Sequence, residues 1–261
     1  MDCSMESSSS CRSSSGYDPI ALSAATEKVV VDGNKRKYVQ LGRPLRFYGG
    51  TTSATEVGCN LRCKFCFSDK PVWKPKKTGK FYTPEQVFEG LAKSALKHVH
   101  KLISASASEG TIGREHLFEL LDLVEGSEFI YILETNGMML GHDKELAEQL
   151  AQYKKLHVRL SIKGTQAEEY QRLTGATEES YELPFIGLQN LMDAGVSCNA
   201  CVMISFSSDE DIQKVRQKLC NIRPGLLKSL ELERITLFPK VAQRLNTEGL
   251  KAVHVNGKMR R

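Results

Sequence analysis

The sequence contains no run of apolar residues that approaches the roughly 18 needed for a membrane-spanning helix. It also lacks the basic and then apolar segments of a secretory signal peptide, because Met1-Asp2-Cys3 leads directly into serines. No short-period repeat is present, which excludes a solenoid. These absences predict a cytoplasmic protein without a membrane partner.

The chain also has no strong excess of charge of either sign. Its 261 residues carry 36 Lys and Arg against 31 Asp and Glu, a net charge of +5. That mild positive charge is compatible with an anionic ligand or with RNA but requires neither, so a nucleic-acid partner is not supported. With 41% hydrophobic and 26% charged residues, the composition is that of a folded protein with one large domain or two small ones.

Cysteine is not scarce, and its spacing is the most informative feature of the sequence. In a reducing compartment, clustered cysteines indicate metal ligands rather than disulfides. Most of the cysteines are scattered, whereas Cys59, Cys63 and Cys66 form a tight cluster spaced C-x3-C-x2-C. Thiolate is a soft ligand that selects zinc, copper(I) or iron–sulfur. Because a closed site needs four protein ligands, three cysteines leave one position open.

Two other metal arrangements compete with this interpretation. A structural zinc site needs a fourth ligand, and no nearby residue has finger-like spacing, since His98 and His100 lie too far along, on a predicted helix. Cys198 and Cys201 suggest an auxiliary cluster, but residues three apart on a strand face opposite sides of the sheet, which argues against one.

Beyond residue 49 the pattern alternates strands with helices about six times. Strands are predicted in the second half of 49–58 and at 102–106, 129–133, 157–162, 196–204 and 229–237. Helices are predicted from Thr83, which begins a capping box, and at 114–124, 144–153, 166–173, 184–194 and 209–220. This order predicts an α/β protein with parallel strands, a partial (β/α)6 TIM-type barrel whose site lies at the carboxyl ends of the strands.

The sequence predicts four regions along the chain. Residues 1–16 form a serine-rich disordered tail, 17–48 an N-terminal extension with a short helix and a hairpin, and 49–239 the core. Residues 240–261 form a basic tail, which is a candidate lid, partner site or RNA contact. A basic loop at 68–80 follows the cysteines.

The cysteine run matches the C-x3-C-x-aromatic-C signature and so resembles the radical S-adenosylmethionine (radical SAM) superfamily. The resemblance implies that Cys59, Cys63 and Cys66 hold a [4Fe–4S] cluster, whose open iron is chelated by the amine and carboxylate of SAM. It also implies that Phe65 packs beside the cluster and the adenine of SAM.

Three later strand ends resemble motifs of the same superfamily. Ser106-Ala107-Ser108-Glu109-Gly110 stands where the family has Gly-Gly-Glu-Pro, which implies that this segment and Glu109 hold the SAM amino group. Glu134-Thr135-Asn136-Gly137 resembles the Asp-Thr-Asn-Gly run of glycyl-radical-enzyme activating enzymes, with Glu134 facing SAM. Leu160-Ser161-Ile162-Lys163 resembles the Leu-Asp-Leu-Lys run of those enzymes, with Ser161 in place of the Asp, which implies that Ser161 and Lys163 lie near the ribose and carboxylate of SAM.

Together these motifs resemble the pyruvate formate-lyase activating enzyme branch. The resemblance implies reductive cleavage of SAM to a 5′-deoxyadenosyl radical, which abstracts hydrogen from an unknown substrate. A protein glycine is favoured, and a small molecule or a nucleic acid stays open. It also implies an electron donor such as flavodoxin or ferredoxin. The alternative is a non-enzymatic, zinc-stabilised α/β binding protein that uses the basic loop and tail.

Overall fold

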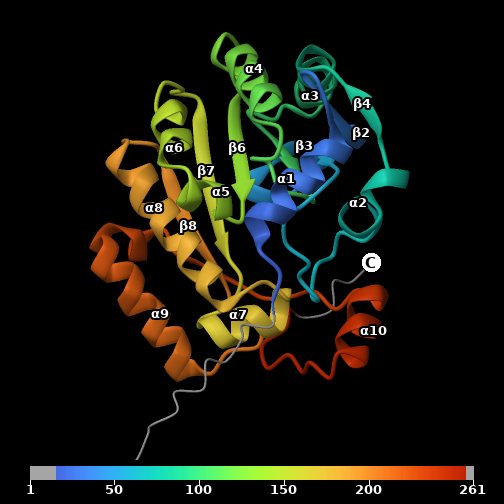
Figure 1. Ribbon diagram of the computed structural model, residues 1–261. Helices are drawn as coiled ribbons and strands as arrows, with labels where there is room; N and C mark the ends of the chain where they lie inside the picture. The colour runs from blue at the N-terminus through green and yellow to red at the C-terminus, as the bar shows by residue number, and fades with distance from the viewer. Residues whose placement is uncertain (1–15, 257–261) are drawn as a thin grey trace, which may run out of the picture.

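The computed structural model describes residues 16–256 and is built around one nine-stranded sheet (Figure 1). Six strands are parallel: β3 Thr51–Glu56, β5 Leu102–Ser106, β6 Ile130–Thr135, β7 Leu156–Ile162, β8 Cys198–Met203 and β9 Glu231–Glu233. They are adjacent in that order, and the described sheet does not close on itself. The predicted α/β fold with a partial barrel of six parallel strands is therefore confirmed.

Three antiparallel strands widen the sheet beside β3. They are β1 Val31–Asp32, β2 Lys35–Leu45 and β4 Lys80–Tyr82, and β2 pairs with all three of its neighbours, β1, β3 and β4. The hairpin predicted in the N-terminal extension is thus present, and it continues the sheet of the barrel. Its first half differs from the prediction, because Val29 and Val30 belong to the preceding helix.

Helices cover the outer face of the sheet and the strand ends. The α-helices are α1 Pro19–Val30, α2 Lys70–Trp73, α3 Pro84–His98, α4 Arg114–Glu125, α5 Met138–His142, α6 Lys144–Leu150, α7 Ala167–Thr174, α8 Leu183–Asp193, α9 Asp209–Ile222 and α10 Pro239–Thr247. Short 3-10 helices are η1 Phe47–Gly49, η2 Pro75–Lys77, η3 Glu178–Glu182 and η4 Pro224–Lys228. Within residues 16–256, no helix is both long enough and apolar enough to cross a membrane.

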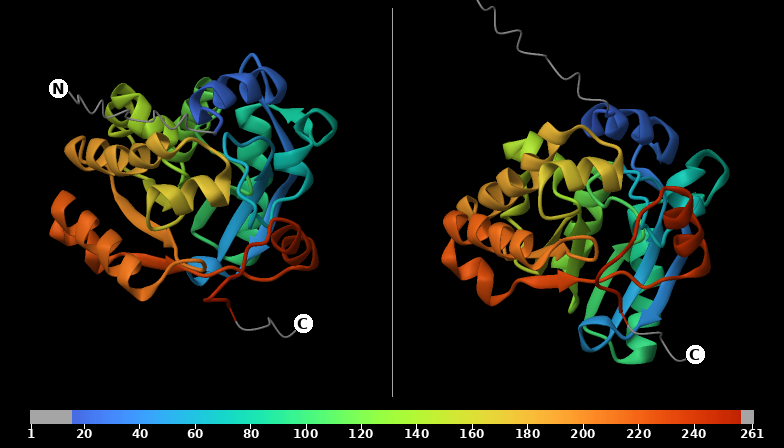
Figure 2. Two further views of the ribbon diagram at one scale, coloured as in Figure 1. Left: turned by 60° about the horizontal axis from the view of Figure 1, so that its bottom comes forward. Right: turned by 90° about the horizontal axis from the view of Figure 1, so that it is seen from below.

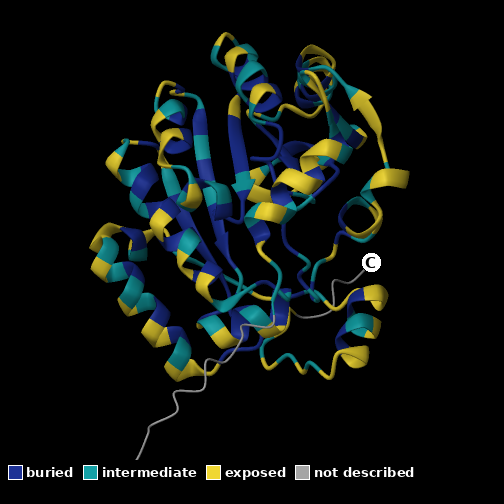
Figure 3. Cartoon of the chain, in the orientation of Figure 1, coloured by how far each residue is buried: buried dark blue, intermediate teal, exposed yellow. Residues whose placement is uncertain are grey.

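Helix α3 illustrates how local sequence determines these elements. Thr83 accepts a hydrogen bond from the backbone of Gln86, whose side chain accepts one from Thr83 N–H, which completes the predicted capping box. Val87, Leu91 and Ala95 recur at helical spacing and are fully buried against the sheet. Figure 3 shows the same division along the chain, with largely buried central strands β6, β7 and β8 and helices in which buried and exposed residues alternate.

The strands alternate in the same way. In β7 the side chains of Val158, Leu160 and Ile162 are fully buried in the hydrophobic core. The intervening Arg159 and Ser161 bond to Glu233 of β9, so they face the barrel interior. Strand β7 therefore presents an apolar face to the hydrophobic core and a polar face to the barrel interior.

Some predicted boundaries were wrong. The helix predicted at 144–153 ends at Leu150, because the next residues turn with tighter i→i−3 bonds, such as that from Tyr153 N–H to Leu150 O. The strand predicted at 229–237 is limited to Glu231–Glu233, because β8 ends at Met203 and offers no further ladder partner. Helices α2, α5 and α10 were not predicted, and α2 lies in the segment predicted to be a basic loop. The serine-rich tail and the last five residues lie outside the described residues, apart from Gly16.

Candidate functional site

The cysteine loop follows β3 at the carboxyl end of the parallel strands. Its backbone is fixed by hydrogen bonds from Lys64 N–H to Leu173 O, at 2.8 Å, and from Cys66 N–H to Cys63 O, at 3.0 Å. All three cysteines are free thiols, and Cys63 is buried. This is the end of the barrel at which a parallel α/β sheet carries its site.

The thiols lie among backbone and amide N–H donors. Cys59 Sγ accepts hydrogen bonds from Leu61 N–H, at 3.4 Å, and from Asn136 Nδ2, at 3.9 Å. Burial raises the pKa of the Cys59 thiol to about 12 and raises the pKa values of Cys63 and Cys66 as well. Thiols that are protonated in isolation become thiolates when they coordinate a metal.

The donor set fits an iron–sulfur cluster. Three soft ligands lie on one loop, none is consumed in a disulfide, and N–H groups point at one of the sulfurs. Between residues 16 and 256, no group of three or more Cys, His, Asp or Glu side chains has the geometry to hold a single metal ion.

Phe65 is 8% exposed and packs against Phe206, with ring centroids 5.8 Å apart. Phe206 follows β8, so the aromatic residue of the cysteine motif joins two sides of the barrel. Its predicted contact with the cluster and adenine stays a prediction.

The segment after β5 meets the cysteine loop through its backbone. Glu109 N–H donates to Gly58 O, at 3.0 Å, and Ser108 Oγ donates to Glu56 O, at 2.8 Å. Ala107 has φ +75°, in the left-handed region that favours glycine. Ala107 therefore adopts a backbone conformation typical of glycine, at a position where the radical SAM motif has a glycine.

Glu109 is 1% exposed, and protein donors surround its carboxylate. Oε1 accepts from Thr111 N–H, Thr111 Oγ1 and Thr135 Oγ1, at 3.2, 2.7 and 2.6 Å. Oε2 accepts from Asn136 N–H at 2.8 Å. The side chain therefore ties the end of β5 to the end of β6, which leaves the surrounding backbone as the part of this segment best placed to meet a ligand.

Asn136 connects these two segments to the cysteines. Its Nδ2 donates to Asn60 Oδ1, at 2.7 Å, and lies 3.9 Å from Cys59 Sγ. The cysteine loop, the 106–110 segment and the 134–137 segment form one hydrogen-bonded unit. The chain order predicted that these strand ends would meet, because the ends of parallel strands share one edge of the sheet.

Glu134, Ser161 and Lys163 lie in the barrel interior. Lys163 Nζ donates to Ser161 Oγ, at 2.6 Å, and Ser161 Oγ donates to Glu233 Oε2, at 2.9 Å. Burial alone would lower the pKa of Lys163, but the charge of Glu233 raises it above its usual value. Lys163 therefore carries its charge in the barrel interior. Burial raises the pKa of Glu134, which accepts a hydrogen bond from Tyr48 Oη at 3.0 Å.

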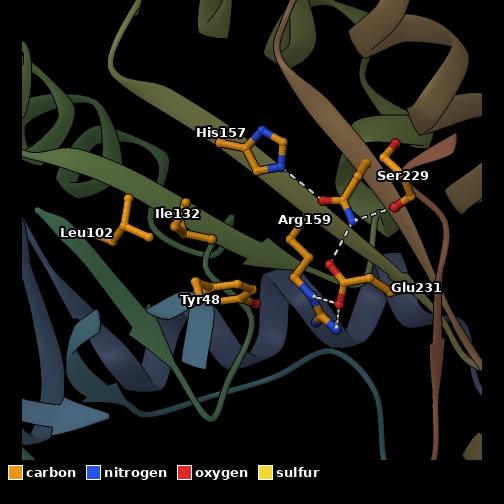
Figure 4. Close-up of a pocket in the computed structure, with 8 residues that line it drawn as sticks. Tyr48, Leu102, Ile132, His157, Arg159, Ser229 and Glu231 are labelled. Atoms are coloured by element: carbon orange, nitrogen blue, oxygen red, sulfur yellow. Dashed lines mark hydrogen bonds and ion pairs between the residues drawn. The ribbon is translucent and has the colours of Figure 1, made fainter. Parts of the chain in front are cut away.

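The interior continues toward the opposite end of the strands as a cavity of about 310 Å³ (Figure 4). Arg159 dominates its polar wall, since the guanidinium donates to Glu231 Oε2 at 2.8 Å and to Glu233 Oε1 at 2.8 Å. Burial alone would raise the pKa of Glu233, but Lys163 and Arg159 lower it to about 2. Tyr48 lies on the other side of the cavity (Figure 4).

Several residues of this site carry no signal in the sequence. Arg36, from the N-terminal hairpin, is 1% exposed and donates through Nη2 to Glu109 O, at 2.7 Å. Glu56 and Tyr38 are buried beside it, with Tyr38 Oη donating to Glu56 Oε1 at 3.3 Å. No local motif marks them, because their partners are far away in the sequence. Glu233 was missed for the same reason.

A family model described as "Radical SAM superfamily" matches residues 55–219. No curated protein matches the chain. Among solved structures, SuiB from Streptococcus suis bound to S-adenosylmethionine is 16% identical, with a TM-score of 0.56 over 70% of this chain and 40% of that chain.

TYW1 with a lysine–pyruvate adduct bound is 16% identical, with a TM-score of 0.50 over 76% of this chain and 72% of that one. A mutant of spore photoproduct lyase is 16% identical, with a TM-score of 0.53 over 74% of this chain and 58% of that one. At these identities the likeness shows the fold alone. The chain spans about 40% of the length of the SuiB chain that it matches.

Proposed function

The chain belongs to the radical SAM superfamily, and from that premise we propose that it binds a [4Fe–4S] cluster and SAM and generates a 5′-deoxyadenosyl radical. The observation that carries the proposal is the hydrogen-bonded unit of three strand ends. It brings Cys59, Cys63 and Cys66 together with the segments that resemble the SAM-binding motifs of the family.

Each part of the unit has a proposed role. Cys59, Cys63 and Cys66 would hold the cluster, which when bound supplies the electron that splits the sulfonium of SAM. The backbone of residues 106–109 would receive the SAM amino group, with Glu109 positioning it. Phe65 would lie beside adenine.

The charged interior supports the remaining contacts. Lys163 is charged and donates to Ser161, and both side chains lie inside the barrel, so we assign Lys163 to the carboxylate of SAM and Ser161 to the ribose. Glu134 would face SAM from β6. We place the substrate in the barrel interior below these residues.

A finer proposal concerns the substrate. The Glu134 and Lys163 motifs resemble those of enzymes that place a radical on a protein glycine. If the chain belongs to that branch, it is an activating enzyme for a glycyl-radical partner protein. Its test is paramagnetic resonance on candidate glycyl-radical partners from the same cell. If no partner acquires a glycyl signal after incubation with the reduced enzyme and SAM, a small-molecule substrate is favoured instead.

The proposal extends to the context of the enzyme. Residues 49–239 would form the catalytic core, with 17–48 and 240–261 as flanking parts. The electron would come from a donor such as flavodoxin or ferredoxin. Free cysteines suit a reducing compartment, which is consistent with a cytoplasmic enzyme.

Anaerobic reconstitution with iron and sulfide tests the proposal. We expect a brown protein with broad visible absorbance and four irons per chain, and we expect the colour to be lost in Cys63→Ala. The matched control is Cys220→Ala, which lies on α9. A colourless protein that holds one zinc per chain would instead support the binding-protein alternative.

A further inference from the structure

Helix α10 lies against the cysteine loop, although it follows that loop by more than 170 residues. The C-terminal segment runs from β9 to the side of the molecule that carries β2, β3 and α2 (Figure 2). Val241 and Leu245, which are 1% and 3% exposed, anchor the helix to the main hydrophobic core. The basic tail predicted from the sequence therefore begins with a docked helix.

Arg244 makes the central contact of this helix. Its Nε donates to Lys64 O, at 2.6 Å, and its Nη2 donates to Cys66 O. The guanidinium also stacks over Trp73, with its central carbon 5.3 Å from the ring centroid. The planar guanidinium of Arg244 therefore holds the backbone carbonyls of Lys64 and Cys66, the residues on either side of Phe65.

Two ion pairs reinforce the same contact. Lys64 Nζ lies 2.9 Å from Glu248 Oε2, just beyond the end of α10, and Lys240, at its start, pairs with Asp69. Exposed pairs of this kind contribute little to stability individually. They do, however, attach both ends of the helix to the segment that carries Cys66, so α10 contacts this segment at three points.

We propose that Arg244 is a positioning residue for the iron–sulfur cluster and that α10 clamps the cysteine loop in its cluster-binding shape. This inference rests on the proposed function, because it assumes that the three thiols hold a cluster. Groups that orient metal ligands through hydrogen bonds typically change metal affinity about 10–100-fold when they are removed. The guanidinium of Arg244 fixes the backbone on both sides of Phe65, and this backbone determines the direction of Cys66 Sγ.

The test compares Arg244→Gln, Arg244→Lys and the control Gln243→Ala, an exposed neighbour on the same helix. Each protein is reconstituted anaerobically and then exposed to EDTA, and loss of visible absorbance is followed. We expect Arg244→Gln to lose its cluster at least about tenfold faster than the wild type. Arg244→Lys keeps the charge but can satisfy only one carbonyl with good geometry, so its rate should be intermediate. Gln243→Ala should match the wild type.

Two further measurements do not depend on activity. The paramagnetic resonance spectrum of the reduced cluster should broaden or shift in Arg244→Gln. In the proteins without cluster, amide hydrogen exchange at residues 63–68 should be faster in Arg244→Gln and unchanged in Gln243→Ala.

Equal cluster lifetimes and equal exchange in Arg244→Gln and wild type would overturn the clamp. So would an equal loss in Gln243→Ala, which would indicate a general effect of the helix. If the wild type itself takes up no cluster, the proposed function fails. The exchange experiment then still decides whether Arg244 holds the loop.

Discussion

The buried carboxylate of Glu109 offers a quantitative test of how the strand ends are held together. It accepts hydrogen bonds from three donors at Oε1 and from Asn136 N–H at Oε2. In Glu109→Gln one oxygen becomes an NH2 group. The less costly orientation keeps the oxygen toward the three donors and places NH2 against Asn136 N–H, so two donors face each other.

The expected cost follows from that geometry. A hydrogen bond to a charged group contributes roughly 1.5–3 kcal/mol, and a buried donor left without an acceptor costs roughly 1–3 kcal/mol. These figures overlap, since both describe the lost bond to Asn136. The three remaining bonds also lose their charged acceptor. We therefore expect Glu109→Gln to lower the free energy of unfolding by about 2–4 kcal/mol.

Urea unfolding of the protein without cluster, under anaerobic reducing conditions, measures this loss. The matched control is Glu89→Gln, on the exposed face of α3, where a change within about 0.5 kcal/mol is expected. A loss in Glu109→Gln no larger than in Glu89→Gln would refute the role of this carboxylate as the link between β5 and β6.

Three other predictions address neighbouring features. Ala107→Gly removes a side chain at φ +75° and should raise the free energy of unfolding by up to about 1 kcal/mol, measured by urea unfolding; a clear decrease would contradict the strain. The pKa of Glu233 is about 2 in the folded protein and about 4.3 in the unfolded chain, so its carboxylate stabilises the fold above about pH 4.3. This contribution, on the order of 2 kcal/mol of the free energy of unfolding, should be lost from the wild type as the pH falls toward 2. Glu233→Gln should lose less over the same acid titration, and identical curves would refute the contribution. Cys198→Ala and Cys201→Ala, made singly, should leave iron content and visible absorbance unchanged, and a loss in either would reveal an auxiliary cluster.

Local patterns predicted the fold well, because the parallel strands alternate with amphipathic helices and some of these helices have a start signal in the sequence. Thr83 and Gln86 form the predicted capping box, and the order of the six parallel strands along the chain is also their order in the sheet. Helix α10 escaped prediction because polar and charged residues outnumber its two buried apolar positions, Val241 and Leu245, whose burial depends on tertiary packing.

The residues of the candidate site also fall into two groups, those with a local sequence signal and those whose contacts depend on the tertiary fold. The three cysteines can be recognised in the sequence because they lie on one loop. The motifs of Glu109, Glu134 and Lys163 can be recognised because each lies at the end of a predicted strand. Arg36 and Arg244 could not be predicted, since each contacts a backbone carbonyl far away in the sequence. A carbonyl leaves no signature in residue type, so only the folded chain reveals these contacts.

The central claim is most directly tested by product analysis. The reconstituted protein is reduced with dithionite in the presence of SAM, and 5′-deoxyadenosine is quantified with Cys63→Ala as the control. The account predicts 5′-deoxyadenosine and methionine in equal amounts from the wild type and neither above background from Cys63→Ala. A wild-type protein that carries a reduced [4Fe–4S] cluster and binds SAM, yet releases no 5′-deoxyadenosine with or without candidate substrates, would contradict it.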